Sequence, residues 1–553
     1  GARHEVNGFG FSPDLVWIKD RTGAETHSIN DIVRGTQKRL QSNATDAENA
    51  GGITKFNPDG FTTSTGYGSD GDGSGHNFVA WGWDMGNSTV TNTDGGISSQ
   101  VRANTTYGQS IVTYTGTGSA SSVGHGLDSA PDMVILKRRN ASEAWSVYHT
   151  GINAGWKVYL NDTAGEADDL SNETFGNLPS SITSTTFGVG THARANASGS
   201  TYVAYCFHDV TGYSKFAKYA GNGTSGNTVT TGFRPAFVMI KDHEHSGENW
   251  YIFDSTREPL GELDTALKAD ESNADTTSST KKVEFTSTGF KLNSTNNALN
   301  GSGHSYIYMA FAGGMDSIAD YNTTGDLDSR IKANTTYGQS IVSYKGNGTN
   351  GQTVGHGLSS TPELIILKRR DSTFAWGVGH TSIGWSKYLE LQSASAEQTG
   401  GGVFNSTAPT SSVFTVADNY NVSGENHMAY CWHSVTGYSK IGSFTGNGDS
   451  RSTPITITCG FKPAFILMKV ADASSNRDWY IWDDTRSNPI AKHLRPNITN
   501  AEAGEAGKIA FTSTGVSITT NDDELNANGK KTIYMVFADK REYAYWLDQS
   551  GNN

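Results

Sequence analysis

The decapeptide ANTTYGQSIV occupies residues 103–112 and returns unchanged at residues 333–342, an offset of 230 residues. The pentapeptide VGHGL repeats at nearly the same offset, beginning at Val123 and again at Val354. Self-similarity at a fixed spacing is the signature of a repeat protein. The sequence therefore contains a duplicated unit of about 230 residues, and this duplication decides the fold.

A shorter motif, consisting of proline, an apolar run and lysine, divides the duplicated unit. It occurs as PDLVWIK from Pro13, PDMVILK from Pro131, PAFVMIK from Pro235, PELIILK from Pro362 and PAFILMK from Pro463. An aromatic residue follows the lysine by eight to ten positions in four copies, as Trp145, Trp250, Trp376 and Trp479, and His27 takes that position in the first copy. We expect five modules, with these four tryptophans buried in their cores.

The apolar runs are four to eight residues long, are rich in Val, Ile, Tyr, Phe and Thr, and are bounded by Gly, Asn, Ser and Thr. This pattern is typical of β-strands. The predicted fold is all-β, with five tandem β-sandwich, jelly-roll-like modules of about 100 residues. Short helices are expected at most near Asp31–Leu40 and Ser393–Gln398.

The motif spacing also predicts module boundaries. The predicted order is module 1 at 1–86, a linker at 87–101, module 2 at 102–210, module 3 at 211–315, a linker at 316–331, module 4 at 332–435, module 5 at 436–541 and a C-terminal tail at 542–553. Two types alternate: the odd modules carry Asp-x-x-Arg (Asp31/Arg34, Asp254/Arg257, Asp483/Arg486), and the even modules carry His-Thr (His149, His380). Module 1 lacks the Tyr/Phe-x-Gly-x-Gly strand that opens the other four.

Composition excludes several classes of protein. The 42 Lys and Arg residues are outnumbered by 55 Asp and Glu residues, which gives a net charge of −13 and no basic face, so we expect no nucleic-acid partner. Three cysteines are too few for a disulfide scaffold. No apolar run reaches the length of a membrane span, so no membrane insertion is expected. The chain begins with Gly rather than Met, which suggests a processed or truncated product.

In these motifs the sequence resembles the tandem-repeat virion structural proteins of tailed phages, especially marine ones, which are often tail-fibre-like. The shared features are Y-x-G-N-G, G-F-x-P-x-F-V-x-I-K, F-x-S-x-G-F and the closing pattern S-G-x-x-Y-x-A-Y-x-F. The resemblance covers nearly the whole chain. It implies a component of a phage particle built from β-sandwich modules, and it implies no catalytic residues.

The sequence predicts no enzyme, no cofactor and no metal site, because it lacks the P-loop, HExxH and CxxC motifs of nucleotide-binding and metal-binding proteins. Asp70 and Asp72 in GSDGDGSG are read as a hairpin turn, with calcium binding as the alternative. Repeated histidines are read as packing or hydrogen-bonding residues: His125, His149, His208, His356, His380 and His433. The Asp-x-x-Arg motif is read as an ion pair.

Four further tryptophans are candidates for a ligand-binding surface: Trp81, Trp83, Trp156 and Trp385. The tail carries a second set of aromatic residues, Tyr543, Tyr545 and Trp546, as a candidate assembly segment. An open sheet edge is a liability, so we expect the tail of a neighbouring copy, or of the same chain, to complete module 1 by strand addition.

These observations predict a non-enzymatic structural protein of a phage particle: a tail fibre, head fibre or decoration appendage. Its expected partners are further copies, in a homo-oligomer or fibre, other virion proteins and a glycan on the host surface. The expected location is the virion. The alternative is a secreted bacterial adhesin, surface-layer protein or extracellular filament protein.

Overall fold

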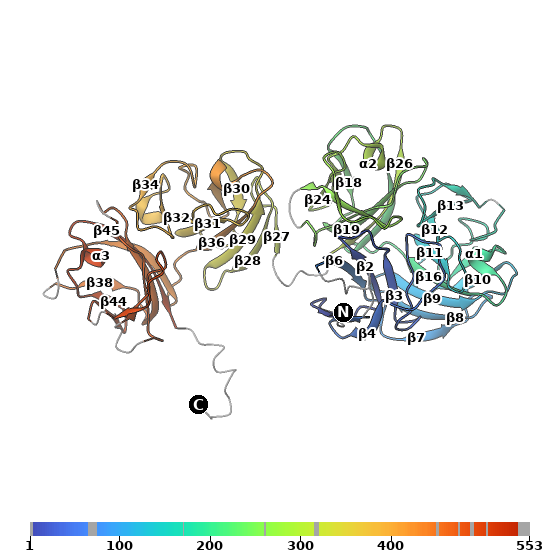
Figure 1. Ribbon diagram of the computed structural model, residues 1–553, viewed down its shortest axis with the longest axis horizontal. Helices are drawn as coiled ribbons and strands as arrows, with labels where there is room; N and C mark the ends of the chain where they lie inside the picture. Colours follow the sequence, from blue (N-terminus) through green and yellow to red (C-terminus); the bar gives the residue numbers. More distant parts are fainter. Residues whose placement is uncertain are drawn as a thin grey trace, which may run out of the picture. The chain divides into compact units, whose positions relative to one another are not determined.

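The computed structural model describes residues 4–64, 75–169, 171–258, 262–313, 320–449, 453–473, 476–486, 492–504 and 507–539. The chain forms two compact units, Gly1–Met315 (unit 1) and Asp316–Asn553 (unit 2) (Figure 1). The fold is all-β, as predicted, and every strand pair described is antiparallel. The α-helices in the described ranges have four residues each: α1 (Ala193–Asn196), α2 (Asn297–Asn300) and α3 (Asp523–Asn526). The two expected helices, at 31–40 and 393–398, are turns and extended chain instead.

Unit 1 contains the sheets of modules 1, 2 and 3. Module 1 has the sheets β3 (Ser28–Asp31), β2 (Leu15–Asp20), β6 (Phe78–Trp83) and β1 (Glu5–Asn7), β5 (Gly60–Thr63), β4 (Ile53–Asn57). Module 2 has β14 (Ala167–Asp168), β13 (Trp156–Tyr159), β12 (Ser146–His149), β11 (Met133–Arg138), β16 (Thr201–Phe207), β9 (Gln109–Thr115), β8 (Ser99–Asn104), β7 (Thr89–Asn92), and separately β10 (Ser121–Gly124) with β15 (Thr186–Val189). Module 3 has β17 (Ser214–Ala220), β26 (Ser305–Ala312), β19 (Pro235–Asp242), β20 (Tyr251–Asp254), β22 (Thr265–Lys268), β23 (Thr276–Thr277), and separately β18 (Asn227–Thr230), β25 (Gly289–Leu292), β24 (Val283–Thr286), β21 (Glu262–Leu263).

Unit 2 repeats this arrangement in modules 4 and 5. Module 4 has β27 (Asp320–Asn322), β28 (Ser329–Asn334), β29 (Gln339–Lys345), β36 (Asn426–Trp432), β31 (Leu364–Arg369), β32 (Gly377–His380), β33 (Lys387–Glu390), β34 (Gln398–Thr399), and separately β30 (Gln352–Gly355) with β35 (Val413–Val416). Module 5 has β37 (Ser439–Thr445), β45 (Lys531–Ala538), β39 (Pro463–Val470), β40 (Tyr480–Asp483); β38 (Ile455–Thr458), β44 (Gly515–Ile518), β43 (Ile509–Thr512); and β41 (Lys492–His493), β42 (Ala503–Gly504). The two even modules share one sheet order, as their sequence similarity predicts.

The same strand order recurs at the centre of every large sheet. The strand that begins near the motif proline lies between the module's closing strand and the strand that follows the aromatic position. In modules 2 to 5 the closing strand also pairs with the opening strand, as β26 does with β17. In module 1 that opening strand is missing, and β6 forms the edge of its sheet within the described residues.

The two predicted linkers contain strands. β7 and β8 in unit 1, and β27 and β28 in unit 2, extend the large sheets of modules 2 and 4 by pairing onto β9 and β29. The linker prediction was wrong for these residues because polar, Gly-rich composition was taken as evidence against strand pairing. An edge strand with both faces near solvent can be polar.

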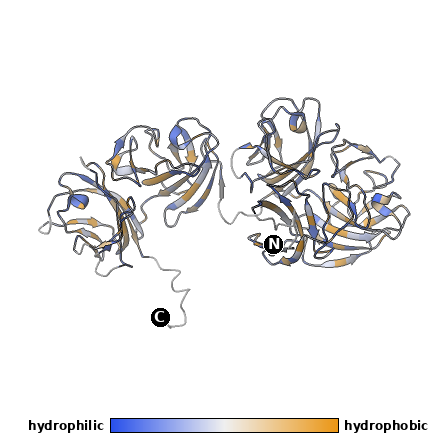
Figure 2. Cartoon of the chain, viewed as in Figure 1, coloured by the Kyte–Doolittle hydropathy of each residue, from blue (hydrophilic) through white to orange (hydrophobic). Residues whose placement is uncertain are grey.

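The proline-motif strands are apolar on both faces of their sheets. In β11, Val134 and Leu136 join the core between the two sheets of module 2, whereas Met133 and Ile135 join a second core on the outer face. Side chains alternate across a strand, so an unbroken apolar run must be covered on both sides. Hydrophobic residues accordingly follow the strands in Figure 2, and the outer faces provide the packing surfaces between modules.

A buried asparagine fixes the loop before each closing strand in modules 2 to 5. Asn300 Oδ1 accepts the backbone N–H of Asn222, and its Nδ2 donates to the carbonyls of Thr224 (2.8 Å) and Ser294 (2.8 Å). Asn196, Asn421 and Asn526 make the same type of bonds to the equivalent Gly-x-Gly loops. These four buried asparagines therefore link two loops in each module.

Replacement of Asn300 by alanine should therefore destabilise module 3. The substitution leaves the buried Ser294 carbonyl without this partner and removes the part-buried bonds to Asn222 and Thr224, which costs about 1–3 kcal/mol. Urea unfolding of the full chain measures the loss. Asn273→Ala, at an exposed position, is the matched control and should leave the unfolding midpoint of unit 1 unchanged, whereas an equal loss at both positions would contradict this role for Asn300.

Candidate assembly surface

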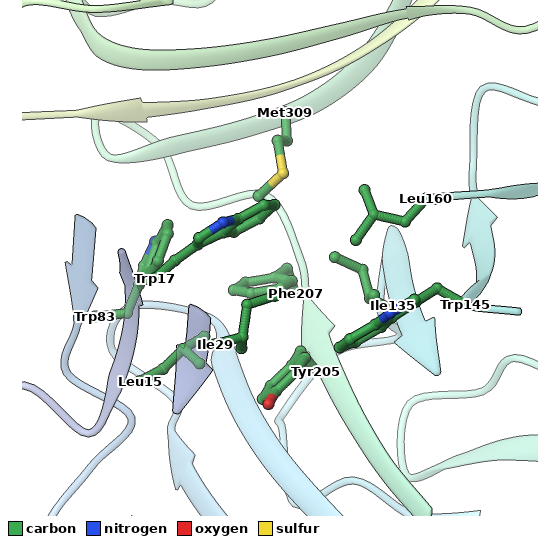
Figure 3. A pocket seen from close by; sticks show the side chains of 10 residues that line it. All are labelled: Leu15, Trp17, Ile29, Trp83, Ile135, Trp145, Leu160, Tyr205, Phe207 and Met309. Atoms are coloured by element: carbon green, nitrogen blue, oxygen red, sulfur yellow. The ribbon is translucent and has the colours of Figure 1, made fainter. Parts of the chain in front are cut away.

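The three modules of unit 1 share one apolar core on their outer sheet faces. Each module contributes its proline-motif strand and its closing strand, including Leu15, Trp81, Ile135, Phe207, Phe237 and Met309. Figure 3 shows side chains from all three modules around a small apolar cavity of about 20 Å³. Three sandwiches that face one centre therefore bury surfaces that none of them could bury alone.

The residue at the aromatic position of each module donates a hydrogen bond to the next module in this ring. The bonds run from Trp145 Nε1 to the Gln41 carbonyl (2.8 Å), from Trp250 Nε1 to the Tyr159 carbonyl (2.8 Å) and from His27 Nε2 to the Lys268 carbonyl (2.9 Å). Module 2 thus donates to module 1, module 3 to module 2, and module 1 to module 3. The ring closes after three steps.

A backbone hydrogen bond accompanies each of these contacts. It runs from Glu48 N to Arg139 O (2.7 Å), from Glu166 N to His243 O (2.6 Å) and from Asp275 N to Arg21 O (2.8 Å). Two of the three pairs add an ion pair, Arg139 with Glu48 (2.9 Å) and Arg21 with Asp275 (2.7 Å). We call this combination of side-chain donor, backbone bond and adjacent charges a junction.

Trp81 and Trp83 lie inside this core and not on a ligand-binding surface. They are 8% and 6% exposed, and their indole rings contact Phe237 edge-on, at 5.5 and 6.0 Å between ring centroids. Trp81 Nε1 also donates to Asp254 (3.3 Å). The prediction of exposed binding tryptophans was wrong here, because the outer face of β6 is covered by module 3.

The other candidate residues are placed as follows. Trp145, Trp250 and Trp479 are buried, as predicted, although they lie between modules as much as within them; Trp376 is only half-buried. Trp156 and Trp385 are half-buried, and Trp385 packs edge-on against Phe404. Asp70, Asp72, Tyr543, Tyr545 and Trp546 lie outside the described residues.

Unit 2 contains one junction of the same kind. Trp479 Nε1 of module 5 donates to the Glu390 carbonyl of module 4 (3.0 Å), and Glu397 N donates to Ala471 O (2.7 Å). The Lys469 ammonium adds a bond across the contact to the Ala394 carbonyl (3.1 Å). Over the described ranges of unit 2, no third sandwich completes a ring.

The surface that a third sandwich would cover is apolar and open. Ile111 is 0% exposed in unit 1, whereas its counterpart Ile341 in unit 2 is 46% exposed. The same change, from buried in unit 1 to half-buried in unit 2, occurs at the pairs Trp145/Trp376, Tyr205/Tyr430, Phe207/Trp432, Phe237/Phe465 and Phe311/Phe537. We call these six positions of unit 2 the open face.

A groove of about 800 Å³ adjoins the open face at Phe465. Its lining includes Tyr337, Gln339, Phe465, Asp483 and Arg486. The corresponding space in unit 1 holds the end of β6: Trp81 and Trp83 contact Phe237, and the Asp84 carbonyl accepts a bond from Gln109 Nε2 (2.7 Å). The groove of unit 2 therefore corresponds in position to the place that the end of β6, the closing strand of module 1, occupies in unit 1.

Three buried histidines, His27, His125 and His149, use both ring nitrogens in hydrogen bonds. In His125 and His149 the Nδ1 atom accepts a backbone N–H two residues ahead, and Nε2 donates to the carbonyls of Thr183 and Tyr308. His27 uses both ring nitrogens too, accepting from Trp17 Nε1 (2.8 Å). Burial lowers the pKa of His149 to about 4 and that of His27 to about 3, so these rings are uncharged at neutral pH.

One cluster in the described part of the chain brings metal-ligating groups together: Asp242, His245 and His304. The two imidazole rings are stacked, with centroids 3.8 Å apart, and each Nδ1 lies against the Asp242 carboxylate. Parallel rings cannot both direct a lone pair at one ion, so this arrangement fits a hydrogen-bonded pair better than a metal centre. Module 1 has the simpler version, His76 on Asp20 (2.5 Å).

Sequence reasoning missed the buried lysines and the junctions. Four motif lysines (Lys19, Lys137, Lys241 and Lys469) are buried, and burial lowers their pKa to about 8. Lys137 and Lys469 each bond a carbonyl of the preceding module. All five proline motifs end in lysine, and this was the sequence signal for the buried lysines. A lysine buried at the end of an apolar strand needs hydrogen-bond acceptors, which backbone carbonyls can supply.

One family model matches the chain twice, over residues 1–314 and residues 316–541, and its description is Domain of unknown function (DUF7483). The two matches coincide with the two compact units. None of the curated proteins matches the sequence. Among the described residues, no helix is long and apolar enough to cross a membrane.

Proposed function

We propose that this chain, which belongs to the DUF7483 family, is a non-enzymatic structural protein of a phage particle, such as a tail fibre, head fibre or decoration appendage. The observation that carries the proposal is the open face of unit 2, where six positions that are buried in unit 1 lie partly uncovered. Exposed apolar surfaces of this kind mark sites of protein association. A chain of rigid sandwiches with an unfilled packing face is suited to assembly.

The groups that could perform catalysis are used to hold the fold. The ring nitrogens of His27, His125 and His149 are engaged in hydrogen bonds, so these rings are not free to shuttle protons. Burial raises the pKa of the Cys431 thiol to about 12, and that of Cys206 is raised as well. A nucleophilic cysteine needs a thiolate near neutral pH. These features favour a structural role.

Glycan binding on the host surface requires aromatic residues other than Trp81 and Trp83, because these two are buried. Of the four candidates, Trp156 and Trp385 are half-buried, whereas the other two are buried. Both belong to even modules: Trp156 begins β13, and Trp385 lies in the turn before β33. A glycan array with the full chain tests this component: signal that disappears in the Trp156→Ala, Trp385→Ala double variant supports it, and unchanged signal assigns binding elsewhere.

The location on a virion is tested by immunogold labelling with an antibody raised against the chain. We expect gold on appendages of purified tailed-phage particles. Detection only on the surface or in the medium of uninfected bacteria would reject the proposal and favour the alternative, a secreted adhesin, surface-layer or filament protein.

A further inference from the structure

We infer that the open face of unit 2 binds one further β-sandwich of the odd type, contributed by another polypeptide of this family. The inference deepens the proposed structural function by naming the partner, and it rests on that function only for the expectation of assembly. The evidence for the partner is internal to the chain, because unit 1 shows what covers the equivalent face.

Module 4 presents the donor half of a junction without its acceptor. Trp376 corresponds to Trp145, which donates to the Gln41 carbonyl of module 1, and Arg370 corresponds to Arg139, which pairs with Glu48. Within the described residues, neither the Trp376 indole N–H nor the Arg370 guanidinium has a hydrogen-bond partner. A partner that offers a loop carbonyl and an adjacent carboxylate would satisfy both groups.

Tyr430 shows that the partner is of the odd type. Its counterpart in unit 1, Tyr205, donates its hydroxyl to Asp31 (2.8 Å) and accepts from Arg34 (3.2 Å), which are the Asp-x-x-Arg residues of module 1. The even modules carry no such motif at that position. An odd-type sandwich on the open face would bring its Asp-x-x-Arg pair to the Tyr430 hydroxyl.

Module 5 presents the acceptor half of a junction. In each module the backbone N–H of the aromatic-position residue donates to a side-chain oxygen, for example from Trp145 to Asn161. The backbone carbonyl two residues before this acceptor receives the junction bond of the neighbouring module. In module 5 the acceptor is Asn497, which places the receiving carbonyl at Arg495. That carbonyl accepts the local turn bond from Ile498, as the Lys268 carbonyl accepts one from Glu271 while also receiving His27.

The groove supplies the third part of the complementarity. In unit 1 the amides of Asn104 and Gln109 donate to the Asp84 carbonyl at the end of Trp81-Gly-Trp-Asp. In unit 2 the counterparts of these amides, Asn334 and Gln339, line the groove beside Asp483, the counterpart of the Asp254 that accepts Trp81 Nε1. The partner should therefore carry an aromatic-x-aromatic-Asp closing strand.

A second copy of this chain does not provide a free sandwich for this site. Three junctions close the ring in unit 1, so neighbouring sandwiches are related by a rotation of about one third of a circle. Unit 2 has two sandwiches, so a ring of the same kind leaves space for one more. In a second copy, modules 1 and 3 are already inside a closed ring, and module 5 is joined to module 4. If module 5 of the second copy bound the open face, its own module 4 would have to occupy the position of the first copy's module 5. The two modules would clash.

The fit is tested with a variant of the full chain in which a second copy of residues 1–85 is inserted between Met315 and Asp316. Seven residues then separate the inserted segment from the end of β27, as seven residues, Gly86–Asn92, connect module 1 to the end of β7. We expect hydrogen exchange in the strands that carry Ile341 and Phe465 to slow by about tenfold or more. Exchange as fast as in the parent chain would overturn the inference.

A matched insertion with Trp81→Ala and Trp83→Ala in the inserted copy is the control, and it should give little protection. Equal protection by both insertions would also overturn the inference, since the groove would then not recognise the closing strand. Sedimentation of the parent chain distinguishes the two other possible occupants of the open face, a second copy and the C-terminal tail. A dimer that Ile341→Lys dissociates would show that a second copy fills the face, and a monomer whose face is protected until residues 540–553 are deleted would assign it to the tail.

These outcomes are distinct from failure of the proposed function. Immunogold labelling that misses the virion would reject the phage assignment and leave the measured protection intact. An unprotected open face would reject the odd-type partner and leave the structural role to be supported by the particle labelling.

Discussion

Replacement of Asp31 by alanine should lower the free energy of unfolding of unit 1 by up to about 3–5 kcal/mol, because it removes the nearer of the two carboxylates that pair with the buried Arg34 guanidinium and leaves only Glu48, at 3.2 Å. Asp31 and Arg34 form an ion pair in which both side chains are 0% exposed, and the Tyr205 hydroxyl of module 2 contacts both. The loss therefore includes a contact between modules 1 and 2. Urea unfolding of the full chain, followed by a probe in unit 1, measures it.

The chain contains its own control for this prediction. Asp483 and Arg486 form the same motif in module 5, but their side chains are 20% and 22% exposed, in the groove that adjoins the open face. A partly solvated pair contributes about 1 kcal/mol or less, so Asp483→Ala should have a small effect on unit 2. Equal losses of stability for Asp31→Ala and Asp483→Ala would show that packing of module 2 on the Asp31–Arg34 pair does not strengthen it.

A second control separates loss of the pair from creation of an unpaired charge. In the double variant Asp31→Ala, Arg34→Met, the buried guanidinium is removed as well, and Glu48 keeps its ion pair with Arg139 (2.9 Å), so much of the stability should return. A double variant as unstable as Asp31→Ala alone would mean that the packing of these side chains, and not their charge, is what matters.

The sheets were predictable from the sequence because the strand signal is local. The proline motif places a strand in each module, and the structure has strands at all five, from β2 at Leu15–Asp20 to β39 at Pro463–Val470. The missing opening strand of module 1 was also predictable, since four aligned modules show what the fifth lacks. Its consequence, an edge at β6, follows from the pairing order.

What covers the outer faces could not be read from local patterns. Trp81 and Trp83 alternate with small residues, as side chains do on an exposed strand face, and they became core residues only because module 3 packs on them. Burial of this kind depends on contacts across more than 150 residues, and no periodicity within a strand reports it. The apolar run on both sides of β11 was the one hint that the outer faces are packing surfaces.

The candidate site was hidden for a related reason. The open face consists of the same motif positions in modules 4 and 5 that are buried in modules 2 and 3, so the sequence looks alike in covered and uncovered copies. Ile111 and Ile341 lie in identical decapeptides and differ in exposure from 0% to 46%. The difference arises from the number of sandwiches in each unit.

Acidification should destabilise unit 1 well before most carboxylates are protonated, because its buried histidines must stay neutral. Burial lowers the pKa of His149 to about 4 from an ordinary value of 6.5. The unfolded chain binds a proton below pH 6.5 and the folded chain does not, so this stabilisation is complete above pH 6.5 and is lost as the pH falls towards 4. For one such imidazole, the loss between pH 7 and pH 4.5 is about 2–3 kcal/mol.

The histidine contribution is isolated by comparing pH profiles. In His149→Asn, the amide oxygen can still accept the Gly151 N–H and nothing titrates, so the difference in stability between pH 7 and pH 4.5 should shrink by about 2–3 kcal/mol. Carboxylates titrate equally in both proteins and cancel. Since His149 Nε2 bonds the Tyr308 carbonyl of module 3, a profile that His149→Asn leaves unchanged would mean that this contact between modules tolerates a charged ring.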